Sequence, residues 1–106
     1  MLIHLNCQDA QALLKQAQWL DIRAIAAYQQ GHIPGALHFD ANALTLFSEH
    51  TPKSTPLIIY CYYGISSQQV GHYLQQAGFQ SVSTLDGGFT EWLAHYPTLI
   101  STLTHD

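Results

Sequence analysis

Short apolar runs alternate with amphipathic stretches along the whole chain. Runs bounded by polar, glycine or proline residues predict five short strands. The expected strands are Ile3–Leu5, Trp19–Ile22, Leu37–Phe39, Leu57–Tyr60 and Val82–Leu85. Between them, apolar residues recur at the spacing of one helix face. This alternation predicts an α/β domain with a five-stranded, mostly parallel sheet that is covered by helices on both faces.

The spacing of apolar residues predicts a helix in each connection and one after the last strand. The expected helices cover residues 9–17, 24–29, 43–49, 66–78 and 87–96. Ser66 and Gln69 form the S-x-x-Q pattern of a capping box at the start of the fourth helix. Gly78 occupies the position expected for a left-handed C-cap of that helix, and Pro97 stops the last helix.

Cys61 lies where the predicted strand Leu57–Tyr60 ends and the loop CYYGISS turns into a helix. Backbone amides at a helix start lack intrahelical partners, and the helix N-terminus carries about half a positive charge. Both favour a thiolate, which is the nucleophilic form of cysteine. Ligands also bind at the carboxyl ends of strands in open parallel sheets. We therefore predict that Cys61 is a reactive nucleophile; the competing interpretation is a small apolar core residue.

The residues that follow Cys61 form the expected cradle for a sulfur anion. This cradle comprises Tyr62, Tyr63, Gly64, Ile65, Ser66 and Ser67. Gly64 permits a positive φ or close packing of the loop backbone. The hydroxyls of Ser66 and Ser67 are expected to cap the helix or to donate toward the sulfur, and the sequence does not choose between them. No residue of the loop carries a charge.

Composition limits the partners of the protein. The chain has 106 residues, so residues 1–106 are expected to form one domain. Its 47% hydrophobic and 9% charged residues exclude a disordered chain. The formal net charge of −4 argues against nucleic acid and anionic membranes as partners. An anion must therefore be bound by local backbone dipoles rather than by long-range attraction.

Cysteine and histidine usage points to a reduced compartment without metal. The two cysteines, Cys7 and Cys61, are too few for a disulfide framework. The N-terminus lacks the pattern of a signal peptide, and no apolar stretch is long enough to span a membrane. We therefore expect a cytoplasmic protein in which Cys7 is a half-exposed spectator. The seven histidines lack the spacing of a zinc site, so no metal or other cofactor is expected.

Four segments together resemble a known family. They are LDIR (20–23), GHIPGALHF (31–39), the CYYGISS loop and LDGGFTEW (85–92). In order and spacing they resemble the rhodanese domain from Asp9 to Pro97, and most closely the single-domain thiosulfate sulfurtransferases of the GlpE type. The resemblance implies a five-stranded, doubly wound α/β fold in which Cys61 forms a persulfide.

The resemblance also implies a function. Cys61 would take the outer sulfur of thiosulfate and pass it to cyanide or to a thiol acceptor such as thioredoxin. Many rhodaneses carry a basic residue in the loop, whereas this loop has none, so we expect weak thiosulfate affinity. An alternative is a sulfur-carrier or protein-interaction module that is loaded by the persulfide of a partner protein.

The other residues of the resembling segments invite structural interpretations. These motif residues are Asp21, Arg23, His32, Gly87, Gly88 and Trp92. Arg23 is expected to pair with Asp21 or Asp40 rather than to contact substrate. His32 is expected to shape the loop that enters the third strand. Trp92 is expected to belong to the core first and to a pocket wall second.

Cysteine phosphatases and arsenate reductases, which use related loops, are a further class to consider. Their chemistry requires Cys-x5-Arg, because the arginine binds a tetrahedral oxyanion through two hydrogen bonds. The sixth residue after Cys61 is Ser67, and the loop offers no guanidinium group. The sequence therefore disfavours phosphatase activity.

Overall fold

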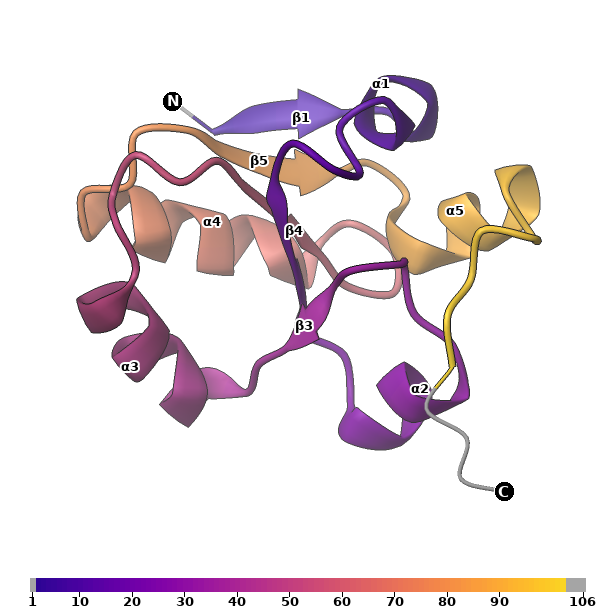
Figure 1. The fold of residues 1–106 in the computed structure, drawn as a ribbon, viewed down its shortest axis with the longest axis horizontal. Coiled ribbons are helices and arrows are strands. Elements are labelled where there is room, and N and C mark those ends of the chain that lie inside the picture. The colour runs from indigo at the N-terminus through magenta and orange to yellow at the C-terminus, as the bar shows by residue number, and fades with distance from the viewer. Residues whose placement is uncertain (1, 103–106) are drawn as a thin grey trace.

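The computed structural model describes residues 2–102, which form a five-stranded sheet flanked by helices (Figure 1). The predicted domain 1–106 also includes residues 1 and 103–106, which lie outside the described part. All named strand pairs are parallel, in the order β1-β5-β4-β2-β3. The strands are β1 (Ile3–Leu5), β2 (Gln18–Asp21), β3 (Leu37–His38), β4 (Leu57–Tyr60) and β5 (Val82–Leu85).

Helices cover both faces of the sheet. They are α1 (Cys7–Gln11), α2 (Ile25–Gln30), α3 (Ala41–His50), α4 (Ser66–Gln76) and α5 (Gly88–His95). Side chains of α3 and α4 pack into one apolar cluster, and side chains of α1, α2 and α5 pack into another. The predicted α/β, doubly wound architecture is therefore confirmed.

The central strand β4 separates the two clusters. Leu57 and Ile59 belong to the cluster under α3 and α4, while Ile58 and Tyr60 belong to the opposite one. This division follows from the two-residue period of a strand. All four side chains are buried, which explains why the sequence shows a continuous apolar run rather than an alternating one. Cys61 follows directly, at the carboxyl end of the most enclosed strand.

The first predicted helix is wrong in its extent. The α-helix covers only Cys7–Gln11, and residues 12–16 continue as turns. In that segment the amide of Leu13 bonds the carbonyl of Ala10, and the amide of Gln16 bonds that of Leu13. These bonds span three residues instead of four, so the chain winds more tightly before it enters β2. The apolar spacing in this segment thus reflects side chains that pack against the core, and it does not show that the backbone is α-helical.

Other boundaries shift by one or two residues. Strand β2 starts earlier than predicted because Gln18 pairs with Leu57, and α3 starts earlier because the Asp40 carboxylate accepts a hydrogen bond from the Ala43 amide at 2.8 Å. Helix α4 ends before Gly78, which has the positive φ expected of a chain reversal. Among the described residues, no helix is long and apolar enough to cross a membrane.

Candidate active site

The sulfur of Cys61 occupies the start of α4. Cys61 is only 5% exposed, and its Sγ accepts hydrogen bonds from the backbone amides of Gly64 at 3.2 Å and Ser67 at 3.3 Å. Ser67 lies in the first turn of α4, where backbone amides have no intrahelical partner. The sulfur therefore takes the position that a capping side chain fills in other helices.

This environment favours the ionised form of the thiol. Burial opposes ionisation, but hydrogen bonds from the Ser67 hydroxyl and from the amides of Ser67, Tyr63 and Gly64 outweigh it. Together they lower the pKa of Cys61 from its ordinary value of 9.0. No basic side chain is among these causes. Main-chain dipoles and one hydroxyl are the groups that favour the thiolate.

The two serines of the loop have different roles. The expected capping box is wrong: Ile65 is the N-cap residue of α4, and its own side chain makes no capping hydrogen bond. Ser66 is exposed, so its hydroxyl faces solvent at the edge of the site. Ser67 is fully buried, and its Oγ lies 2.5 Å from Oγ1 of Thr84 on β5. Of the two hydroxyls, that of Ser67 is the one that helps to lower the pKa of the Cys61 thiol.

Glycines allow the loop to pack against α5. Gly64 has a φ of +84°, and a Cβ on it would lie 2.8 Å from the amide nitrogen of Gly87. Gly88 has a φ of +61°, and a Cβ there would lie 2.6 Å from the carbonyl oxygen of Cys61. Side chains at Gly64 or Gly88 would therefore push the loop away from α5.

The start of α5 holds the loop by its carbonyl groups. The amide of Phe89 donates to the carbonyl oxygen of Cys61 at 2.8 Å, and the amide of Thr90 donates to that of Tyr62 at 3.0 Å. These amides belong to the first turn of α5 and would otherwise lack partners. Because α5 binds these carbonyl groups on one side of the loop, the loop amides are free to point toward the sulfur on the other side.

The mouth of the site is small and uncharged. A hollow of about 210 Å³ is lined by Cys61, Tyr62, Tyr63, Ile65 and Ser66. Tyr63 is 68% exposed and Ile65 is 73% exposed, so apolar side chains surround the entrance. The hollow offers amides and hydroxyls to an anion, but no charged side chain lines it.

Arg23 does not line the hollow at Cys61 but contacts residues that surround it. Its guanidinium forms a bidentate pair with Asp21, with Nη2 at 2.7 Å from Oδ2, and also donates to the Gly31 carbonyl at 2.6 Å. Of the two acids expected as partners, Asp21 is the one that binds Arg23. The guanidinium carbon lies 4.0 Å from the Phe89 ring centre and 5.6 Å from that of Tyr62. Arg23 thus connects β2 to the residues that carry the loop.

The remaining motif residues have structural contacts. His32 is buried, stacks on Tyr28 with ring centres 3.9 Å apart, and places Nδ1 2.9 Å from the Tyr28 carbonyl oxygen. Trp92 is fully buried, packs against Trp19, and donates through Nε1 to the Leu99 carbonyl. Trp92 is therefore a core residue, as expected. Neither Trp92 nor His32 lines the hollow at Cys61.

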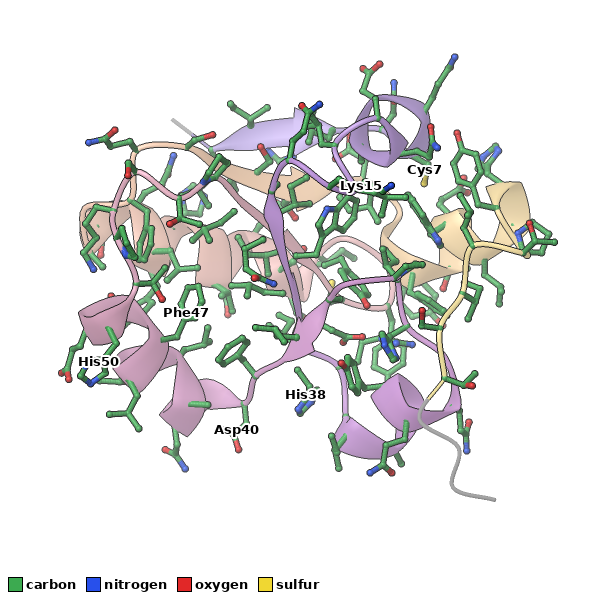
Figure 2. The ribbon with its side chains drawn as sticks, in the orientation of Figure 1. Cys7, Lys15, His38, Asp40, Phe47 and His50 are labelled. Atoms are coloured by element: carbon green, nitrogen blue, oxygen red, sulfur yellow. The ribbon has the colours of Figure 1, made fainter. Side chains whose placement is uncertain are left out.

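Cys7 is buried, which contradicts the expectation of a half-exposed residue. Its side chain extends from α1 toward α5 (Figure 2), at a separate hollow of about 460 Å³ that Glu91 and Asp86 also line. Burial and the nearby carboxylates of Glu91 and Asp86 raise the pKa of the Cys7 thiol. The two cysteines thus have opposite electrostatic environments, and Cys61 is the more acidic thiol.

Sequence reasoning missed several contacts that shape the site. Thr84 holds the Ser67 hydroxyl, and Gln68 Nε2 donates to the Gly64 carbonyl at 2.8 Å. The amides of α5 were missed as well, because a backbone donor has no sequence signature. The signal that could have identified Thr84 is weak: it is one of two polar residues, with Ser83, in the buried strand β5. Within residues 2–102, no three His, Cys, Asp or Glu residues gather into a group that could hold a metal ion.

Comparisons with known proteins agree with this geometry. The family model described as the rhodanese-like domain matches residues 6–95. The thiosulfate sulfurtransferase GlpE of Coxiella burnetii is 45% identical over 78 residues, which cover 74% of this chain and 73% of that protein. The protein of that name from Tolumonas auensis is 37% identical over 95 residues, covering 88% and 90%. The solution structure of a rhodanese-like domain from Anabaena is 25% identical and superposes with a TM-score of 0.84, covering 96% of this chain and 80% of that one.

Proposed function

This chain belongs to the rhodanese-like domain family, and on that premise we propose that it is a thiosulfate sulfurtransferase that works through a persulfide on Cys61. Relatives at 37–45% identity over most of the chain bear the name thiosulfate sulfurtransferase, which supports the reaction class. The observation that carries the assignment of the nucleophile is the pair of amide hydrogen bonds from Gly64 and Ser67 to the Cys61 sulfur.

The first half-reaction loads the enzyme. The Cys61 thiolate attacks the outer sulfur of thiosulfate, a bond forms between the two sulfurs, and the sulfur–sulfur bond of thiosulfate breaks. Sulfite leaves with the bonding electron pair, so charge is conserved without proton transfer. The terminal persulfide sulfur then carries the negative charge, and the converging loop amides are the groups available to stabilise it.

The second half-reaction discharges the persulfide. Cyanide attacks the outer sulfur through carbon, thiocyanate forms, and Cys61 leaves as a thiolate. A dithiol protein such as thioredoxin instead takes the sulfur on one thiolate. The acceptor's second thiol then attacks the cysteine sulfur that carries the transferred atom. The transferred sulfur leaves as hydrosulfide, and the dithiol is oxidised to a disulfide. A covalent intermediate divides the transfer into two displacements at an accessible sulfur.

A second candidate function rests on the uncharged mouth. Tyr63 and Ile65 offer apolar surface at the entrance and no cation to a dianion. Such a surface also suits a carrier module that receives its sulfur from the persulfide of a partner protein. Turnover separates the two functions: an enzyme cycles with thiosulfate and an acceptor, whereas a carrier accepts one sulfur from its partner and does not cycle with thiosulfate.

Intact-mass measurement after incubation with thiosulfate tests the proposed function. Wild type should gain the mass of one sulfur atom, Cys61→Ser should gain none, and Cys7→Ser should behave as wild type. Addition of cyanide should restore the original mass and yield one thiocyanate per sulfur lost. Uptake that depends on Cys7, or none in wild type, would reject Cys61 as the thiosulfate-loaded nucleophile.

The cytoplasm is the compartment that this chemistry favours. Both cysteines are free, and the reaction needs Cys61 as a thiolate and a reduced acceptor. Thiols stay reduced where glutathione and thioredoxin systems operate. We therefore place the reaction in the cytoplasm.

A further inference from the structure

A further hollow lies along α4 from the mouth of the active site, on the same face of that helix. It is a groove of about 290 Å³ between α3 and α4, lined by Leu44, Thr45, Gln69, Val70 and Tyr73. Ser66 lines the mouth at Cys61. Gln69, Val70 and Tyr73 follow Ser66 at i+3, i+4 and i+7, the spacing that places side chains on one helix face. At 1.5 Å per residue, the groove extends to about 10 Å along α4 from Ser66.

The surface shared by the mouth and the groove carries no charge. Between residues 54 and 85 the sequence contains no Asp, Glu, Lys or Arg, a stretch that includes the active loop and all of α4. Tyr73 is 43% exposed, and the side chains that line both hollows are aromatic, aliphatic, amide, thiol or hydroxyl groups. Exposed helices normally carry charged residues on their solvent face. Protein interfaces, in contrast, are enriched in tyrosine and depleted of Lys, Glu and Asp.

We propose that the mouth at Cys61 and the α3–α4 groove together dock the acceptor, a protein that presents its cysteine on an apolar, weakly charged surface. This inference rests on the proposed sulfur transfer. A small thiol or cyanide fills the mouth and leaves the groove empty. Only a macromolecule covers both hollows while its sulfur reaches Cys61. Because the groove and the mouth at Cys61 lie along one face of α4, the pair of hollows selects a protein thiol.

The test follows discharge of a preloaded persulfide. Wild type is loaded with thiosulfate, freed of excess reagent, and mixed with cyanide or with reduced thioredoxin as the protein probe. Gln69→Glu and Tyr73→Glu each place a carboxylate in the groove, outside the reacting loop. Gln29→Glu adds the same charge to an exposed position on α2, on the opposite face of the sheet, and controls for net charge.

The proposal expects saturable discharge by thioredoxin. The half-saturating thioredoxin concentration should rise at least tenfold in Gln69→Glu and Tyr73→Glu and stay within twofold in Gln29→Glu. Discharge by cyanide should stay within twofold in all three variants. Half-saturation that is insensitive to the groove variants, discharge that never saturates, or equal effects on both acceptors would overturn the proposal. So would a wild-type dimer that Tyr73→Glu dissociates, because the groove would then hold a second copy.

Failure of the underlying function would look different. If wild-type Cys61 gains no sulfur from thiosulfate, the proposed function falls and this inference falls with it. If Cys61 loads and cyanide discharges it while the groove variants behave as wild type, only the docking inference fails.

Discussion

The backbone amide of Phe89 donates a hydrogen bond to the carbonyl oxygen of Cys61, across a distance of 2.8 Å. Two segments far apart in the sequence thus meet at Cys61. Amides of the loop and of the start of α4 donate to the sulfur of Cys61. The backbone carbonyl of the same residue accepts from α5. The position of the sulfur therefore depends on the glycines that let α5 approach.

Gly88→Ala should damage both activity and stability. A methyl group there would lie 2.6 Å from the Cys61 carbonyl oxygen, and the φ of +61° costs a non-glycine residue about 1–2 kcal/mol. We expect a fall in the free energy of unfolding of more than about 2 kcal/mol and a loss of sulfur transfer of at least about tenfold, because a displaced loop loses amide contacts to the sulfur. Urea unfolding and steady-state rates measure the two effects.

Gly35→Ala is the matched control for Gly88→Ala. Gly35 also has a positive φ, +84°, but a Cβ there meets no atom within 4 Å. It should cost about 1–2 kcal/mol from backbone strain alone and leave the transfer rate unchanged. Equal effects on activity in both variants would show that the approach of α5 does not position the loop.

Alkylation by iodoacetamide should follow the ionisation of Cys61. Because the loop lowers the pKa of Cys61 below 9.0, its alkylation rate should reach half its maximum at a pH below that value. Cys7, whose pKa is raised, should react more slowly at neutral pH. Mass spectrometry of the modified peptides measures both sites. A half-maximum for Cys61 at or above pH 9 would contradict the proposed electrostatics.

The lowered pKa of Cys61 also makes the stability of the fold depend on pH. A depressed folded pKa means that the thiolate stabilises the fold, and this contribution is fully present above the unfolded pKa, near 9. It is lost as the pH falls through the folded pKa. The stability difference between wild type and Cys61→Ser should therefore shift in favour of wild type as the pH rises through that window. Unfolding curves at several pH values provide the measurement.

Ser67→Ala and Ser66→Ala should separate the roles of the two serines. Removal of the Ser67 hydroxyl takes one donor from the sulfur environment and leaves buried Thr84 without its partner, at a cost of about 1–3 kcal/mol. The pKa of Cys61 should rise in Ser67→Ala. Ser66→Ala should change neither quantity, because its side chain is exposed. The pH dependence of alkylation and urea unfolding distinguish the two serines, and a larger effect at Ser66 would reverse the assignment.

A positive charge at the mouth should improve thiosulfate binding. Ile65 lines the mouth and is largely exposed, so Ile65→Arg can be accommodated. An exposed ion pair is worth about 0.2–1 kcal/mol, which corresponds to a decrease in the thiosulfate KM of up to about fivefold. This gain should shrink at high salt. Ile65→Gln, neutral and of intermediate length, should leave KM near the wild-type value; an equal gain from glutamine would exclude charge as the cause.

Arg23 should prove structural in mutagenesis. Arg23→Met leaves the Asp21 carboxylate buried without its guanidinium, and such a loss costs about 3–5 kcal/mol. Asp21→Asn combined with Arg23→Met removes both charges and should recover part of that stability. Urea unfolding of the single and double variants tests the pair. Unchanged stability with a selective rise in the thiosulfate KM would instead place Arg23 in the binding site.

The fold was largely readable from the sequence because its strands are short and separated by clear breakers. The two fully buried strands, β4 and β5, begin and end at the predicted residues. The first helix was misjudged because Leu13, Leu14 and Ala17 pack against the core from a segment of tight turns. Apolar spacing records which side chains are buried, and it does not distinguish four-residue from three-residue hydrogen bonds.

The candidate site was readable only in part. The position of Cys61 after a buried strand, with Gly64 following, was enough to predict the amide contacts to its sulfur. The role of Ser66 was misread, because a capping pattern does not show that the sulfur of Cys61 already occupies the cap position. The contributions of Thr84 and of the α5 amides arise from tertiary packing, which local sequence patterns do not record.

Because the Cys61 sulfur closes the first turn of α4, the chemical state of that atom and the integrity of the helix start are linked. Oxidation or alkylation of Cys61 would take an acceptor from the Ser67 amide and leave the helix end to fray. Hydrogen exchange at Ser67 and its neighbours would then accelerate when a reagent reaches the sulfur. The protein thus contains an internal reporter of its own modification, which could be used to screen covalent ligands without an activity assay.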